Sequence, residues 1–281
     1  MELTLVISLL CLLFAIAFKL WRQPKQPKNN LPPGPAGLPI MGHIHLIQNP
    51  IHERLQKLSQ TYGPVMSLRF GSRFVVVVSS PSAAEECFSK NDIILANRPP
   101  FLNGKYLNYN FTTVAAANYG DHWRNLRRLG CIEIFSATRL KSFLDIRKDE
   151  VTRLVGRLHQ ASKHGFEKVE LRTMLLDETF NVIMRMMAGK RYYGEGVDDV
   201  KEAEEFKQHM QEYSKYTKAT NLSDLFPILQ LIDLGGLRKG MTSLSKKMDM
   251  FLQGLVEEHR GDKTCRNTMI SHLLALQESQ P

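Results

Sequence analysis

Three patterns of apolar residues follow one another along the chain. Residues 3–18 are almost continuously apolar, residues 65–78 combine alternation with a β-branched run, and beyond residue 120 apolar residues recur at helical spacing. The early patterns predict a helix over 51–61, strands over 65–70 and 74–78, and a helix that begins near Pro81. The later pattern predicts helices over residues 121–135, 138–160, 172–188, 201–218, 238–260 and 268–277. The expected fold class is mainly α, of the α+β type, with a small N-terminal β-sheet followed by stacked helices.

The first apolar stretch predicts a transmembrane anchor over residues 1–21. Its continuous part, 16 residues long, would span about 24 Å as a helix, and Leu20 with Trp21 extends it towards the roughly 30 Å of a bilayer core. Basic residues follow the stretch and none precedes it, so the body is expected on the cytosolic side. A cleaved signal peptide is the rival interpretation, with Ala15-Ile16-Ala17 as a cleavage site.

Residues 22–39 form a basic, proline-rich segment, and residues 40–281 form the body. Six prolines lie between Pro24 and Pro39, and proline fixes φ and removes a hydrogen-bond donor. The segment is therefore expected to act as a semi-rigid spacer between the anchor and the body.

A formal charge of +9 favours acidic partners such as anionic lipid, an acidic redox protein or nucleic acid. No nucleic-acid-binding motif accompanies that charge, so no nucleic-acid partner is expected. The four cysteines include no CxxC pair, which gives no support for a zinc site or a disulfide framework. His43 and His45, in the loop after the prolines, are expected to be solvated and to bind no metal.

One motif could bind an acidic group. In the run from Tyr119 to Arg127, Asp121 is expected to cap a helix on which Trp123 and Arg127 share one face. An indole N–H and a guanidinium converging there suit a buried pair of carboxylates. The alternative is a core tryptophan beside solvated arginines. Residues 101–118, just before the motif, are expected to form a long loop.

Several motifs in order carry a resemblance to a known family: the apolar anchor, Leu31-Pro32-Pro33-Gly34-Pro35, Tyr62-Gly63-Pro64, Asn97-Arg98-Pro99 and the Tyr119–Arg127 run. Together they resemble the microsomal cytochromes P-450 of plants over essentially all 281 residues. The resemblance implies haem b as cofactor, with Trp123 and Arg127 at its propionates. It also implies that the preceding loop shapes the substrate pocket, and the candidate pocket residues are Phe111, Val114, Ala115 and Ala116.

Later segments are similar to isoflavone and flavonoid hydroxylases, among them residues 180–194, 224–227 and 268–274. This similarity implies a monooxygenase of plant secondary metabolism that hydroxylates a small phenolic, such as an isoflavone, with molecular oxygen. Electrons would come from NADPH through NADPH–cytochrome P-450 reductase. The expected location is the endoplasmic reticulum membrane, with membrane lipid as a further partner.

The family's later motifs are missing from the chain. None of its cysteines stands in an F-x-x-G-x-R-x-C-x-G loop, and the oxygen-activating A-G-x-[DE]-[ST] pattern does not occur, so no catalytic or metal-ligating residue is assigned. Glu150-x-x-Arg153 and Glu257-x-x-Arg260 match the family's E-x-x-R by letters only and are expected to be ordinary helix pairs.

Residues 40–281 are therefore expected to be an incomplete, N-terminal portion of the catalytic domain, inactive alone. The alternative is a non-catalytic, truncated membrane-anchored helical protein or pseudogene product.

Overall fold

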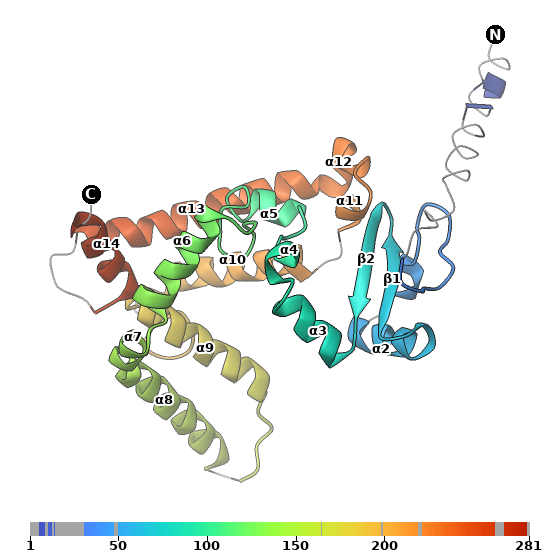
Figure 1. Cartoon of the computed structure of the whole chain (residues 1–281). Helices are drawn as coiled ribbons and strands as arrows, with labels where there is room; N and C mark the ends of the chain where they lie inside the picture. The colour runs from blue at the N-terminus through green and yellow to red at the C-terminus, as the bar shows by residue number, and fades with distance from the viewer. Residues whose placement is uncertain are drawn as a thin grey trace. The chain divides into compact units, whose positions relative to one another are not determined.

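The architecture is given by a computed structural model, which describes residues 6–8, 11–12, 14, 31–47, 50–163, 165–197, 199–218, 221–261 and 267–279. The chain divides into two compact units, which are described separately. The first comprises Met1–Asn97 and Thr220–Gly235, and the second comprises Arg98–Ala219 and Gly236–Pro281 (Figure 1).

Most of the predicted anchor, residues 1–21, and residues 22–30 of the predicted spacer lie outside the described residues. Within the described ranges, no helix combines the length and the apolar character needed to cross a membrane. The anchor therefore stays a prediction from the sequence.

The first unit is built around a two-stranded antiparallel sheet of β1 (Val65–Phe70) and β2 (Arg73–Val78). Val65 pairs with Val78 and Phe70 with Arg73, and Gly71 makes the tight turn with a φ of +59°. The unit also contains η1 (Ile44–Leu46), α2 (Ile51–Tyr62), α3 (Pro81–Phe88), α4 (Asp92–Leu95), α11 (Leu222–Leu225) and α12 (Leu229–Ile232). The predicted strands and the predicted helices at 51–61 and from Pro81 are confirmed.

The proline-rich segment lies against β1 and is fastened there by a buried histidine. Ser67 donates its backbone N–H to the Pro33 carbonyl at 2.9 Å. His43 is 1% exposed; its Nδ1 accepts the Arg69 N–H at 2.7 Å, so its Nε2 carries the proton and donates to the Pro35 carbonyl at 2.8 Å. The expectation of a solvated histidine is wrong here, because backbone groups satisfy both ring nitrogens.

The second unit is a stack of helices. It contains α5 (Leu102–Tyr106), α6 (Asp121–Leu129), the π-helical turn η2 (Gly130–Ile134), α7 (Ala137–Ser142), α8 (Leu144–Ser162), α9 (Leu171–Ala188), α10 (Val200–Lys218), α13 (Leu237–Gly261), which follows η3 (Leu234–Gly236), and α14 (Met269–Ser279). In Figure 1, α8 lies beside α9 and α10 lies along α13. The predicted helix over 138–160 is two helices, because the chain breaks at Phe143 to bury that ring completely.

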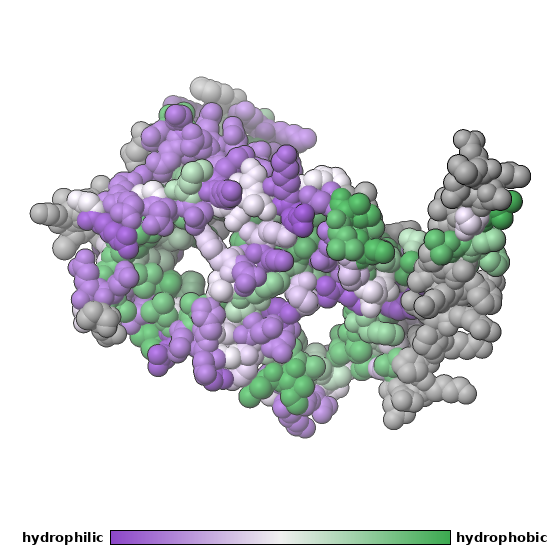
Figure 2. Space-filling view, turned by 90° about the horizontal axis from the view of Figure 1, so that it is seen from above, coloured by the Kyte–Doolittle hydropathy of each residue, from purple (hydrophilic) through white to green (hydrophobic). Residues whose placement is uncertain are grey.

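The core of this unit joins α9, α10 and α13 around an aromatic cluster. Tyr192 is 1% exposed and its ring centroid lies 4.6 Å from that of Phe206, which in turn lies 5.6 Å from Phe251. The buried residues of the cluster are Met184, Ala188, Tyr192, Ala203, Phe206 and Leu255. Other apolar side chains remain exposed, and Figure 2 shows such patches between hydrophilic areas on one face.

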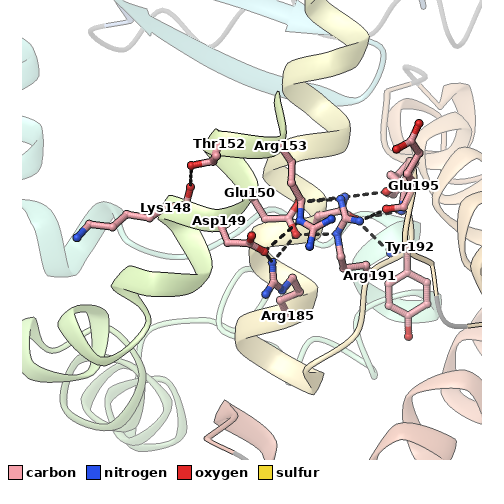
Figure 3. Close-up of polar contacts among 11 residues, drawn as sticks. Lys148, Asp149, Glu150, Thr152, Arg153, Arg185, Arg191, Tyr192 and Glu195 are labelled. Carbon is pink, nitrogen blue, oxygen red and sulfur yellow. Dashed lines mark hydrogen bonds and ion pairs between the residues drawn. The ribbon is translucent and has the colours of Figure 1, made fainter. Parts of the chain in front are cut away.

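A fully buried carboxylate, that of Glu150 in α8, ties α8 to α9 and to the turn that follows (Figure 3). Its Oε1 accepts from Arg185 Nη1 at 2.6 Å and from Arg191 Nε at 2.7 Å, and its Oε2 accepts from Arg191 Nη2 at 3.0 Å. Burial alone would raise the pKa of Glu150, but the hydrogen bonds from Arg191 and Arg185 outweigh it and hold the pKa below its usual value. Glu150 is therefore a charged group inside the unit.

The expected helix pair between Glu150 and Arg153 is wrong. Arg153 instead pairs with Asp149, one turn earlier, at 3.1 Å between its Nε and Oδ2. The expected pair between Glu257 and Arg260 is confirmed at 2.7 Å and lies at the surface.

Replacing Glu150 should destabilise the protein strongly. In Glu150→Gln, Arg185 and Arg191 keep their burial and lose their shared counter-charge, so the free energy of unfolding should fall by about 3–5 kcal/mol. Urea denaturation measures this. The control Glu257→Gln removes half of an exposed pair and should cost less than about 1 kcal/mol. Equal losses in the two variants would contradict the assignment of Glu150 as the ionic centre.

A second carboxyl of this unit, that of Glu178 in α9, is buried without the bonded arginines that Glu150 has. It is 7% exposed, and neither of its oxygens has a hydrogen-bond partner among the described residues. Burial, followed by the negative charge of Glu150, raises its pKa, and the positive charges of Arg157 and Arg191 offset only part of this. The Glu178 carboxyl therefore keeps its proton to a higher pH in the folded protein than in the unfolded chain.

This raised pKa predicts how Glu178→Gln changes stability with pH. Folding takes up a proton between the unfolded pKa of about 4.3 and the raised folded pKa, so the free energy of unfolding of the parent falls as the pH rises through that interval. Glutamine does not ionise, so the variant avoids the cost of burying a charged carboxylate. Its gain in the free energy of unfolding over the parent should therefore be zero below that pH interval, rise through it and stay constant above it. Unfolding curves measured across pH test this, with the exposed Glu204→Gln as control. A gain that does not change with pH would contradict it.

Candidate functional site

The segment before α6 is more structured than a long loop. The expectation for residues 101–118 is partly wrong, because α5 occupies 102–106. After α5, three consecutive residues, Tyr109, Asn110 and Phe111, have φ of +48°, +53° and +64°. This left-handed conformation costs a residue with a side chain roughly 1–2 kcal/mol, so the surrounding contacts must hold the segment in place.

Contacts with α5 and α13 hold the strained residues. The Phe111 N–H donates to the Gly104 carbonyl at 2.9 Å, and the Phe111 ring packs where a Cβ atom on Gly104 would be. The Tyr109 hydroxyl donates to Asp249 Oδ1 at 3.0 Å, and burial, followed by this hydrogen bond, raises the pKa of Tyr109. Phe111, a predicted pocket residue, thus directs its ring to α5.

Helix α6 begins differently from the prediction. Gly120 is the N-cap and Asp121 is the first helical residue, with no side-chain capping bond. The Asp121 carboxylate forms an ion pair with Arg124, whose guanidinium also lies 5.3 Å from the centroid of the Tyr119 ring. The acidic residue still suits the positive end of the helix dipole.

Two neighbouring side chains of α6 bind the backbone of the preceding segment. His122 Nε2 lies 2.8 Å from the Thr112 carbonyl oxygen, and Trp123 Nε1–H donates to the Val114 carbonyl at 3.1 Å. The Trp123 ring centroid lies 5.7 Å from that of Tyr119. The carboxyl half of the segment is therefore attached directly to the helix that carries the motif.

A mostly apolar cavity of about 300 Å³ lies between this segment and the end of α6. Val114 lines it, and among the described residues that line it Arg127 is the one with a charged side chain. The remaining lining residues are Thr112, Thr113, Leu126, Leu129, Gly130, Cys131, Ile134 and Phe135. The π-helical turn η2 supplies several of them, and such turns recur at functional sites.

Arg127 is the charged group available in this cavity. It is exposed, and its guanidinium forms no hydrogen bond or ion pair within the part of the chain that the structure describes. By contrast, the neighbouring Arg124 is already paired with Asp121. A planar guanidinium without a partner at the edge of an apolar cavity can bind the carboxylate of an otherwise apolar molecule.

The structure thus brings some of the predicted site residues together and leaves others apart. Val114 and Arg127 border one cavity, and Trp123 is attached to Val114 by its hydrogen bond. Ala115 is exposed and Ala116 is half-buried in the following turn, and neither lines the cavity. Their roles towards haem or substrate stay predictions. No role was predicted for His122, although its place between Asp121 and Trp123 puts it at the start of the motif helix.

The residues present fit the acidic edge of a haem in part. Arg127 and the apolar cavity suit a flat, largely apolar group that carries carboxylates. The Trp123 N–H is engaged by Val114, so a propionate there would have to displace that carbonyl. Among the described residues, no three His, Cys, Asp or Glu side chains gather to hold a metal ion.

Comparisons with known proteins identify relatives of this chain. The family model for cytochrome P-450 matches residues 32–280. The chain is 53% identical to cytochrome P-450 81E8 of Medicago truncatula and 51% identical to isoflavone 3'-hydroxylase of the same plant, covering 99% and 98% of this chain. It is 49% identical to (+)-piperitol/(+)-sesamin synthase of Sesamum radiatum over its whole length. In each case the match covers 56% of the relative, so the chain spans about half the length of these curated proteins.

Proposed function

The chain belongs to the cytochrome P-450 family, with its mostly helical fold and small antiparallel sheet, and on that premise we propose that it supplies the haem-edge and substrate-loop region of a monooxygenase acting on plant phenolics. The observation that carries the proposal is Arg127, without a partner among the described residues, at an apolar cavity. In this proposal Arg127 binds a haem propionate, and residues 112–114 face the substrate.

Haem held by a cysteine thiolate would supply the oxygen-cleaving chemistry, and Arg127 would hold its propionate edge. In the overall reaction, one oxygen atom of O₂ would enter a C–H bond of the substrate and the other would leave as water, with two electrons from NADPH delivered by a reductase and two protons, one from NADPH and one from solvent. This chain's part is to orient the haem edge through Arg127 and to exclude water with the apolar residues around it.

An isoflavone is the proposed substrate, because two of the relatives at 51% identity are named as isoflavone hydroxylases. A relative of nearly equal identity is named for piperitol and sesamin formation, so the broader proposal is a small aromatic, oxygen-rich substrate. The predicted anchor and the net charge of +9 support a location at the endoplasmic reticulum membrane, with the body cytosolic and a reductase as partner.

An oxygen-isotope experiment tests the proposal. The protein expressed from the complete transcript, in membranes with reductase, NADPH and an isoflavone, should yield a product that carries one oxygen atom from labelled O₂. The reduced protein should also give a thiolate-type absorption band with carbon monoxide.

Omitting the reductase is the matched control and should abolish product formation. A protein that binds no haem and gives no carbon monoxide band would contradict the enzyme assignment. Haem binding without any hydroxylated isoflavone would contradict the substrate assignment alone.

A further inference from the structure

Residues 112–114 present three consecutive backbone carbonyls, and each of them has a partner. The Thr112 carbonyl lies 2.8 Å from His122 Nε2, and the Val114 carbonyl accepts from Trp123 Nε1 at 3.1 Å. The Thr113 carbonyl between them accepts the backbone N–H groups of residues 116 and 117, at 3.1 and 2.8 Å. The backbone path beside the cavity is thus fixed at three successive points.

The partners of the Thr112 and Val114 carbonyls are both side chains in the first turn of α6. A carbonyl oxygen only accepts, so His122 must carry its proton on Nε2 to make this bond. His122 and Trp123 are adjacent in sequence and reach carbonyls two residues apart, in a segment whose backbone runs through turns. The helix therefore holds the segment with two side chains.

The segment needs such support because of what precedes it. Three left-handed residues, 109–111, lead directly into Thr112. Local bonds hold part of the chain just after them: Thr112 donates its N–H to the Asn108 carbonyl and its hydroxyl to the Tyr109 carbonyl, and the Thr113 hydroxyl donates to Asn108 Oδ1. The attachment to α6 adds the two bonds that hold the Thr112 and Val114 carbonyls beside the cavity.

From this geometry we propose that His122 is a positioning residue that, together with Trp123, clamps residues 112–114 against α6 and so determines which substrates, and which position of a substrate, the cavity accepts. The inference rests on the proposed function for its substrate part. The clamp itself depends only on contacts within this unit, so the two can be tested apart.

The same contacts give different roles to side chains of α6. Trp123 uses its only N–H on Val114, and His122 uses Nε2 on Thr112, so both act on the segment. Arg127, one turn further along, has no such partner in the described ranges and is left for an anionic group in the cavity. Two roles thus share one helix, and substitutions can separate them.

Hydrogen exchange of the full chain without added ligand tests the clamp. In His122→Leu, the protected amides of residues 110–112, 116 and 117 should exchange roughly three- to tenfold faster, the loss expected for one net hydrogen bond. His122→Gln keeps an N–H donor at similar reach and should restore slow exchange. His159→Leu removes an exposed histidine from α8 and should leave the segment unchanged.

Unchanged exchange in His122→Leu would overturn the clamp. Equally fast exchange in His122→Gln and His122→Leu would overturn it too, because the donor would then be irrelevant.

Kinetics of the haem-loaded enzyme test the substrate part, with the isoflavone daidzein as probe. His122→Leu should raise KM severalfold and change the ratio of hydroxylated products, while haem content stays at the parent level and His122→Gln restores both values. If exchange is faster but KM and the product ratio equal those of the parent, the specificity role is wrong. If the enzyme binds no haem, the proposed function fails while the exchange result still decides the clamp.

Discussion

The buried carboxylate of Glu150 is the constraint on which the helical unit depends. A fully buried negative charge needs positive groups bonded to it, and here Arg185 in α9 and Arg191 in the turn after it supply them. Since these partners lie 35 and 41 residues away in sequence, satisfying one carboxylate fixes α8, α9 and the following turn relative to one another. Tyr192, next to Arg191, then enters the aromatic cluster that α10 and α13 share.

Elsewhere in the same unit, hydrogen bonds to neighbouring helices, and no buried ion pair among the described residues, hold the candidate site. The strained residues 109–111 are held by α5 and α13, and the next three residues are held by α6 and by their own turn. The π-helical turn that follows α6 contributes Gly130, Cys131 and Ile134 to the cavity lining. The result is a fixed apolar wall with a single charged side chain, that of Arg127, which is the arrangement an amphipathic, acidic cofactor edge requires.

Periodicity was enough to predict most of the regular elements. The strands 65–70 and 74–78 and the helices near 51–61, 172–188, 201–218 and 238–260 follow directly from residue spacing. Helices of four or five residues, such as α4 and α5, are too short to show a period. The break at Phe143 follows from burying one ring, which spacing does not reveal.

Contacts between residues far apart in the sequence could not be predicted from it. Glu150 looked like half of a local helix pair, and nothing near it in sequence indicates Arg185 or Arg191. His43 looked solvated because its partners, the Pro35 carbonyl and the Arg69 N–H, become neighbours only when the segment packs on β1. At the site, the sequence predicted Trp123 and Arg127 as candidates, whereas the His122 bond to Thr112 depends on the path of a strained loop.

The central claim, that Arg127 holds the acidic edge of haem in an apolar cavity, is tested most directly by comparing two ligands. The chain and its Arg127→Leu variant would each be titrated with hemin and with its uncharged dimethyl ester, which has the same ring system without free carboxylates. We expect the parent to bind hemin about tenfold or more tightly than the ester, as for a hydrogen bond to a charged group, and the variant to lose that preference while it still binds the ester. An equal preference for hemin in both proteins would contradict the claim.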